Sequence, residues 1–246
     1  MAPLGEVPSG SAVVFGAGGA IGRALTARLL AGGRFAEVYA GQRRADMASL
    51  PGAIPFAFEL TDEASIAAVA EQVSAPLRLV IVATGLLHDH QRGIVPEKSL
   101  RALDAGVMAE VLAANTIGPA LIAKHCLPRF PRGERAVFAV LSARVGSIGD
   151  NRLGGWHSYR ASKAALNMLV RNFAIELARS HPQAVVAALH PGTVDSCLSA
   201  PFQRGVAPGK LFSPDQSAGH LLSVLEGLTA ADSGGHFAWD GARIPD

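Results

Sequence analysis

A glycine-rich turn near the start of the chain limits most strongly what this sequence can fold into. The apolar run 12–15 leads directly into residues 16–22, in which Gly16, Gly18, Gly19 and Gly22 stand close together. Apolar residues then recur at three- to four-residue spacing until a pair of glycines ends the pattern, which predicts a strand, a turn and a helix. Such a unit cradles phosphate, because glycines admit close backbone approach and the N–H groups of the helix start face the anion. An ordinary tight turn is the alternative for the glycines taken alone.

The rest of the chain alternates apolar runs with segments of helical periodicity. The predicted strands are residues 12–15, 37–40, 55–58, 79–83, 136–141, 185–189 and 235–239, and the predicted later helices are 63–73, 105–125, 159–180 and 214–225. Several runs are continuously apolar, as strands buried on both faces are. We therefore predict an α/β fold, a doubly wound parallel sheet of about seven strands with helices on both faces. One domain spans residues 1–246, and the loop 196–213 is a predicted substrate lid.

Composition excludes several classes of protein. With 246 residues, 49% apolar and 17% charged, the chain suits one large core and does not have the composition of a disordered chain. The net charge is only +2 and the Lys and Arg residues are dispersed, so the sequence has no basic stretch typical of nucleic-acid-binding proteins. Cys126 and Cys197 have no metal-ligand spacing, so we expect reduced thiols in a cytoplasmic protein. We also expect no membrane partner, since no apolar run reads as long enough to span a bilayer.

Tyr159 and Lys163 stand four residues apart on a predicted helix, which places a phenol beside an ammonium group. A nearby positive charge favours the phenolate and lowers the tyrosine pKa from its usual value of about 10. A tyrosine of this kind can give a proton to a carbonyl oxygen or take one from an alcohol. Taken alone, this spacing is most simply explained by a helix face exposed to solvent. The glycine turn at the start of the same chain favours a catalytic pair instead.

Together these motifs resemble the short-chain dehydrogenases/reductases, which pair a G-x-x-x-G-x-G turn with a Y-x-x-x-K helix. Here Ala20 stands where the middle glycine is usual, and residues 154–167 and 239–245 look most like the C-factor and sniffer-type branch. The resemblance covers essentially the whole chain. It implies a Rossmann-type fold and an NAD(P)-dependent oxidoreductase that moves hydride between nicotinamide and a carbonyl or alcohol substrate. The alternative is a catalytically weak nucleotide-binding regulatory or signalling protein of C-factor type.

The resemblance assigns roles to the catalytic residues. Tyr159 is the general acid/base, and Lys163 holds the nicotinamide ribose. Asn115 matches a helix asparagine that anchors a water path to the lysine, with a structural hydrogen bond as the equal alternative. The family's fifth strand ends in S-S-x-x-G, but alignment on Gly146 places Ala143 at the second serine. Ser142 is therefore the expected substrate contact, with Ser147 or no serine as alternatives.

The resemblance also implies a cofactor site at the ends of the strands. Its predicted residues are Gly16, Gly18, Gly19, Ala20, Ile21, Gly22, Arg43, Arg44, Glu59, Leu60, Ala83, Thr84, Gly85, Tyr159, Lys163, Pro191, Gly192, Thr193, Val194 and Ser196. Gly41 stands about where the family places an acid that favours NAD. Because Gly41 cannot repel a 2′-phosphate and two arginines follow it, NADP(H) is favoured, with NAD(H) as the alternative.

The sequence predicts a small-molecule carbonyl or alcohol as the partner, and no nucleic acid. It predicts no metal, because the pair His88 and His90 lacks further spaced ligands. A homodimer or homotetramer is typical of the family, although the sniffer-like branch includes monomers. Asp62, by contrast, reads as a helix N-cap rather than as a site residue.

Overall fold

The computed structural model describes residues 9–43 and 50–246. Its main sheet has seven parallel strands in the order β3-β2-β1-β4-β5-β6-β9. These strands are β1 (Ser11–Phe15), β2 (Glu37–Gln42), β3 (Ile54–Ala57), β4 (Leu77–Val82), β5 (Val137–Leu141), β6 (Val185–His190) and β9 (His236–Ala238). Each predicted strand is confirmed, with ends that differ by one or two residues.

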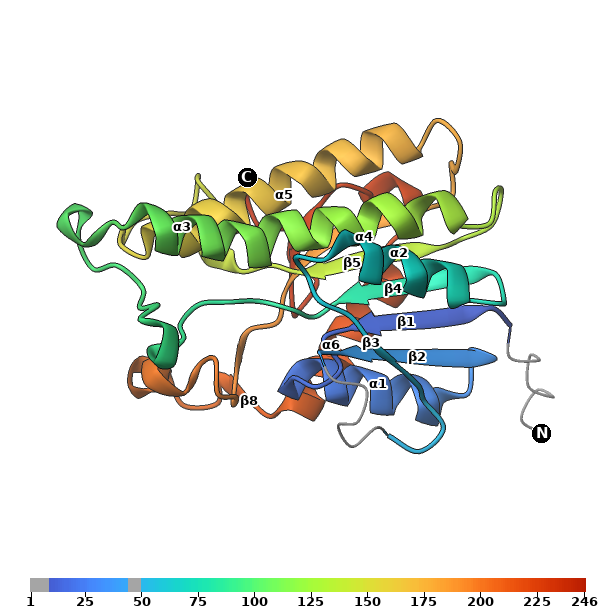
Figure 1. Cartoon of the computed structure of the whole chain (residues 1–246), viewed down its shortest axis with the longest axis horizontal. Helices are drawn as coiled ribbons and strands as arrows, with labels where there is room; N and C mark the ends of the chain where they lie inside the picture. The colour runs from blue at the N-terminus through green and yellow to red at the C-terminus, as the bar shows by residue number, and fades with distance from the viewer. Residues whose placement is uncertain (1–8, 44–49) are drawn as a thin grey trace.

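Helices cover both faces of this sheet (Figure 1). On one face lie α1 (Ala20–Gly32) and α6 (Pro214–Gly227), and on the other lie α2 (Glu63–Gln72), α4 (Gly118–Cys126) and α5 (His157–Leu177). The Asp62 side chain accepts a hydrogen bond from the Ala64 amide and caps α2, as predicted. The doubly wound α/β architecture is therefore confirmed.

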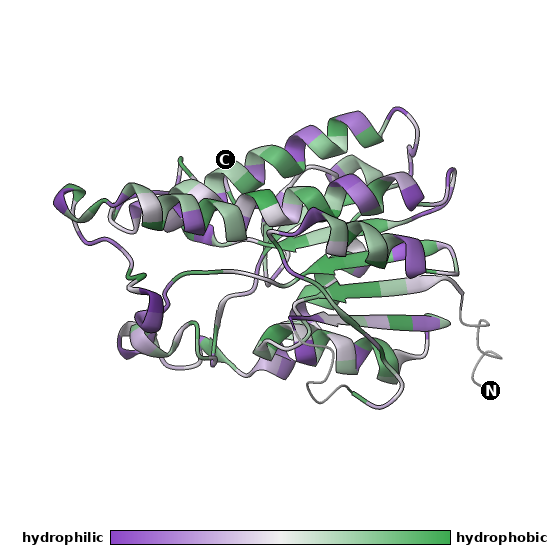
Figure 2. Cartoon of the chain, in the orientation of Figure 1, coloured by the Kyte–Doolittle hydropathy of each residue, from purple (hydrophilic) through white to green (hydrophobic). Residues whose placement is uncertain are grey.

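Successive residues of the central strands point to opposite layers. Along β1, Val13 and Phe15 join the core beneath α2, α4 and α5, whereas Ala12 and Val14 join the core beneath α1 and α6. This follows from the two-residue period of a strand, and it explains why the strands are apolar without alternation. Figure 2 shows the same pattern, with mainly hydrophobic central strands between helices that carry both kinds of residue.

The strand order reverses between β1 and β4, and this reversal positions the site. After β1 the chain runs outward to β2 and β3, then crosses back so that β4 pairs with β1 on its other side. Because all strands are parallel, the glycine turn after β1 and the loop after β4 leave the sheet at the same edge. Ligands of open α/β sheets bind at such a switch point.

The helix predicted over 105–125 differs from the structure in its middle. It consists of α3 (Ala105–Leu112), one π-helical turn (Ala113–Ile117) and α4. The stretch Ala105–Arg129 is also long and apolar enough, by length and composition alone, to cross a membrane, which our interpretation of the sequence overlooked. Core helices of soluble proteins meet the same criteria, and here α3 packs on α5 and α4 packs on α2.

The predicted lid has more regular structure than a loop. Within residues 196–213 a 3-10 helix covers Ala200–Gly205, and β8 (Leu211–Phe212) pairs with β7 (Thr193–Val194) in a second, two-stranded sheet. Two-residue strands are too short to show a period, so the sequence pattern did not reveal them.

Gly22 offers a test of the packing at the glycine turn. A Cβ atom at position 22 would lie 2.2 Å from the backbone oxygen of Gly16, which cannot move aside as a side chain could. We expect Gly22→Ala to lower the free energy of unfolding by about 1–3 kcal/mol, measured by urea denaturation without cofactor. Gly32→Ala in the same helix is the matched control, because a Cβ there meets nothing within 4 Å. Equal stabilities of the two variants would contradict this account.

Candidate active site

A cavity of about 650 Å³ lies at the switch point, where the loops after the first four strands meet. The predicted residues that line it are Gly16, Gly18, Gly19, Arg43, Glu59, Leu60, Ala83, Thr84 and Gly85. Asp89 also lines it, as its place after the fourth strand in the sequence suggested. The lining residues that the sequence did not indicate are Gln42, Phe58, Thr61, Leu86, Arg92, Glu110, Ala113 and Ala114. The predicted ends of β1, β2, β3 and β4 therefore contribute to one shared cavity.

The glycine turn fits a bound phosphate. Gly16 has φ +91°, and a Cβ atom there would lie 2.9 Å from the backbone of Ala83. The N-cap of α1 is Gly19, which has no capping side chain, and no acidic residue follows in the first turn, formed by Ala20, Ile21 and Gly22. The positive end of the helix dipole is thus left for an anion. The buried hydroxyl of Thr84 has no hydrogen-bond partner among the described residues, so a polar ligand would satisfy it.

Gly41 has a structural reason to be glycine. A Cβ atom at this position would lie 2.2 Å from the ring of Phe56 on the neighbouring strand. Any larger side chain at this position would require the Phe56 ring to move, so glycine suits the close packing of β2 on β3. Arg43 follows two residues later, exposed at the border of the cavity. Arg44 lies outside the described residues.

Lys163 is buried where α5 crosses the end of β5. Its Nζ atom donates a hydrogen bond of 2.8 Å to the carbonyl of Leu141, and the residue is 2% exposed. The same atom would lie 3.8 Å from a Cβ built on Gly85, so the ammonium also reaches the end of β4. Burial lowers the pKa of Lys163 to about 8, because a dry environment disfavours the charged form.

Tyr159 lies one turn before Lys163, with Lys163 Nζ 5.8 Å from the centre of its ring. Burial raises the pKa of Tyr159 to about 12, opposite to the lowering that the four-residue spacing predicted. That prediction was wrong for the protein without cofactor, because desolvation outweighs the neighbouring ammonium. The phenol therefore carries its proton at neutral pH, as a proton donor to a carbonyl oxygen must.

Asn115 occupies the π-helical turn and is fully engaged in hydrogen bonds. Its amide oxygen accepts from the Leu86 amide at 2.7 Å, and its amide nitrogen donates to the Leu86 carbonyl and the Ser162 hydroxyl. These bonds join the loop after β4 to α5 beside Lys163. A structural hydrogen-bonding role for Asn115 thus has direct support, and its role in a water path to Lys163 stays a prediction.

Ser142, which follows β5, belongs to a buried polar chain. Ser142 donates a hydrogen bond of 2.7 Å to the Asn167 side chain, whose amide nitrogen lies 3.3 Å from His236 Nδ1. Burial lowers the pKa of His236 to about 4, so the imidazole is neutral. The single hydrogen of the Ser142 hydroxyl is thus directed to Asn167. Ser147 accepts a hydrogen bond from the Asp150 amide.

Sequence reasoning did not identify Asn167 or His236. Asn167 of α5 contacts Ser142, and His236 of β9 contacts Asn167, so the polar chain joins three segments that are far apart in the sequence. No spacing along the chain reports such a contact.

The predicted segment after β6 does not line the cavity. Gly192 has φ +77°, and a Cβ atom there would lie 2.7 Å from the Phe212 ring. Thr193 and Val194 form β7, and the Ser196 hydroxyl donates to the Val194 carbonyl at 3.2 Å. The cofactor-binding role of Pro191, Gly192, Thr193, Val194 and Ser196 stays a prediction.

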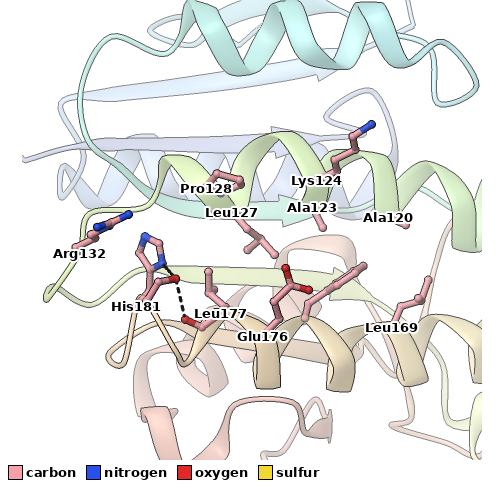
Figure 3. Close-up of a pocket in the computed structure, with 12 residues that line it drawn as sticks. Ala120, Ala123, Lys124, Leu127, Pro128, Arg132, Leu169, Glu176, Leu177 and His181 are labelled. Carbon is pink, nitrogen blue, oxygen red and sulfur yellow. Dashed lines mark hydrogen bonds between the residues drawn. The ribbon is translucent and has the colours of Figure 1, made fainter.

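A second cavity, of about 500 Å³, lies between α4 and α5 (Figure 3). Its walls include Leu127 of the segment after α4 and Leu169 and Leu177 of α5. None of the predicted site residues lines it, so it is separate from the candidate active site. Within residues 9–43 and 50–246, no three His, Cys, Asp or Glu side chains gather to hold a metal ion.

The lowered pKa of Lys163 predicts a pH dependence of stability. Below about pH 8 folded and unfolded chains both hold this proton, whereas between about 8 and 10.5 only the unfolded chain does. The free energy of unfolding should therefore rise through this window relative to Lys163→Met, which lacks the group. Urea denaturation from pH 7 to 10.5 measures the difference. Lys124→Met, on the exposed surface of α4, is the control and should keep the wild-type slope; parallel curves for wild type and Lys163→Met would contradict a buried ammonium.

Solved structures resemble this fold throughout. The NADPH-bound carbonyl reductase from chicken fatty liver superposes with a TM-score of 0.82 at 28% sequence identity, over 99% of this chain and 97% of that one. The carbonyl reductase Sniffer of D. melanogaster gives a TM-score of 0.81 over 97% of this chain and 100% of that one. At 19% identity, the second likeness shows the fold alone.

Sequence relatives agree with the structural ones. The C-signal of Myxococcus xanthus is 34% identical over 148 residues, which are 60% of this chain and 83% of that protein. The 1-hydroxy-2-glutathionyl-2-methyl-3-butene dehydrogenase of Rhodococcus sp. (strain AD45) is 31% identical over 193 residues, 77% of this chain and 79% of that protein. The family model of the short chain dehydrogenases matches residues 11–206. This chain, whose helix α5 carries Tyr159 and Lys163, therefore belongs to the short-chain dehydrogenase family.

Proposed function

We propose that this protein is an NADP-preferring oxidoreductase that acts on a small carbonyl or alcohol substrate. The observation that carries the proposal is the burial of Tyr159 and Lys163 one turn apart on α5, with the Lys163 ammonium bonded to the end of β5 and close to Gly85. Gly85 lines the cavity of the glycine turn, although Tyr159 and Lys163 themselves do not. A solvated helix face would leave both groups in water. Burial of an ammonium and a phenol has a free-energy cost that a structural role does not require.

The residues present fit a nicotinamide dinucleotide. The turn from Gly16 to Gly22 would hold the pyrophosphate, Arg43 the 2′-phosphate of NADP, and Lys163 the nicotinamide ribose. When bound, the cofactor supplies or accepts the hydride. Tyr159 gives its proton to the substrate oxygen in reduction and takes it back in oxidation, and burial keeps water away from that transfer.

Names of the relatives support this reading at the level of reaction class. One solved relative is a carbonyl reductase with NADPH bound, and one curated relative is a dehydrogenase. A further relative, the benzil reductase of Bacillus subtilis, is 29% identical over 128 residues, which are 46% of this chain and 51% of that protein. Both directions of the same chemistry thus occur among them, and a panel of ketones and alcohols with both cofactors would identify the substrate.

A second function, that of a catalytically weak nucleotide-binding regulator, is favoured by the arrangement of residues after β5. Ala143 stands where a second serine is usual, and the Ser142 hydroxyl is bound to Asn167. The similarity to C-signal points the same way. A regulator would bind the cofactor without carbonyl-dependent turnover, and this distinguishes the two functions.

Cofactor preference is tested at Arg43. The guanidinium can pair with the 2′-phosphate that only NADP carries, so Arg43→Ala should weaken NADPH binding by about 10–100-fold and NADH binding little. Fluorescence titration of both cofactors at fixed salt measures this. Arg92→Ala, which removes another cation from the wall of the same cavity, is the control and should change both affinities alike. Equal binding of NADPH and NADH by the wild type would refute the preference.

Proton transfer is tested at Tyr159. Tyr159→Phe removes only the hydroxyl and should abolish most turnover, by about 10²–10⁴-fold, while NADPH affinity and the melting temperature stay close to wild type. The chain has two tyrosines, so Tyr39→Phe is the matched control and should keep full activity. Near-normal turnover by Tyr159→Phe would show that the reaction does not use this mechanism.

Two further expectations remain predictions. The described cysteines, Cys126 and Cys197, are unpaired, which is consistent with the proposed cytoplasmic location. The proposed homodimer or homotetramer would be tested by the mass of the protein in solution.

A further inference from the structure

The helix that carries Tyr159 begins without a cap of its own. Helix α5 starts at His157, and its N-cap residue, Trp156, makes no side-chain hydrogen bond to the helix. Tryptophan has no group suited to this position, where Ser, Thr, Asp and Asn are favoured. The first amides of a helix nevertheless need partners when they are buried. The cap must therefore come from elsewhere in the chain.

Glu97, in the long loop after β4, supplies it. Its backbone oxygen accepts a hydrogen bond of 2.5 Å from the Trp156 amide. Its carboxylate accepts from the Ser158 amide at 3.2 Å and also from the Ser158 hydroxyl. Glu97 is 4% exposed, although glutamate is almost never fully buried without a partner. The helix dipole favours a carboxylate at this end.

These bonds hold Trp156 in a strained conformation. Trp156 has φ +51° and is the one non-glycine residue with positive φ in the part of the chain that the structure describes. Such a conformation costs about 1–3 kcal/mol and persists only when the surroundings enforce it. Glu97 enforces it from both sides, through the amide of Trp156 and through Ser158.

The strained backbone places the indole ring between the site and the lid. The ring centre of Trp156 lies 6.2 Å from that of Tyr159 and 4.8 Å from that of Phe202, in the 3-10 helix of the lid. On the far side, Phe202 meets His88, whose Nε2 atom lies 3.1 Å from the Leu198 carbonyl of the lid. Trp156 thus packs against the proton-transfer residue and the lid together.

We propose that Glu97 is a positioning residue for this site, which caps α5 and fixes Trp156 so that Tyr159 and the lid hold one geometry. A serine or asparagine at the N-cap would satisfy the helix but would remove the indole ring. The Glu97 carboxylate caps the helix from another segment and so leaves the indole ring in place at position 156. The inference rests on the proposed function only where it concerns turnover, since the clamp itself is a property of the fold.

A spectroscopic test addresses the clamp without any substrate. The chain has two tryptophans, so in a Trp239→Phe background Trp156 is the only one left. Glu97→Ala should shift the emission of Trp156 to longer wavelength, because the half-buried indole loses its packing. Glu97→Gln keeps an acceptor for Ser158 and should restore the emission. Glu226→Ala removes a carboxylate from an exposed ion pair with Arg34 and, as the control, should change nothing. Unshifted emission in folded Glu97→Ala would overturn the proposal.

Kinetics then test the positioning of Tyr159. Small displacements of a catalytic group can reduce a rate by about 10²-fold, so Glu97→Ala should lower kcat by about 10–100-fold while the NADPH Kd stays within about twofold. Glu97→Gln should recover most of kcat. A normal kcat in Glu97→Ala despite shifted emission would overturn the positioning role. If wild type itself shows no carbonyl-dependent turnover, the proposed function fails, and the emission experiment still decides the clamp.

Glu97→Asp keeps the test decisive if Glu97→Ala does not melt cooperatively. Aspartate keeps the charge but is one methylene shorter, so it should leave the fold intact, shift the emission and lower kcat. Wild-type emission and kcat in Glu97→Asp would overturn the proposal.

Discussion

The hydrogen bond from Lys163 Nζ to the Leu141 carbonyl is the interaction on which the candidate site depends. It joins the second turn of α5 to the end of β5, in a place closed to water. Because the bond is 2.8 Å long and the ammonium is buried, Lys163 cannot move without leaving a polar group unsatisfied. Tyr159, one helical turn earlier, is fixed with it.

The same burial sets the chemistry of both residues. A dry environment disfavours charge of either sign, so it lowers the pKa of Lys163 and raises the pKa of Tyr159. Both groups are shifted toward the neutral form by one physical cause. A phenol that keeps its proton is ready to protonate a carbonyl oxygen, whereas alcohol oxidation needs additional positive charge near Tyr159. An oxidised nicotinamide would bring such a charge.

Segments far apart in sequence hold this arrangement in place. Asn115 connects the π-helical turn to Leu86 and Ser162, and Glu97 connects the loop after β4 to the start of α5. Both supports come from residues between β4 and β5, which the chain passes before it forms the helix that they brace. The loop after β4 therefore takes part in the cavity at the switch point and also in the position of α5.

The sequence by itself determined the architecture, because the period of apolar residues and the glycine turn depend only on local geometry. It identified all seven strands of the main sheet, the helices around it, and half of the residues that line the cavity at the switch point. Tertiary structure alone decided the sign of the Tyr159 pKa shift, since spacing reports a neighbour but not the loss of water. It alone also directed the Ser142 hydroxyl to Asn167 and brought Glu97 to Ser158. Contacts between distant segments leave no period in a sequence, and burial is a property of the packed chain.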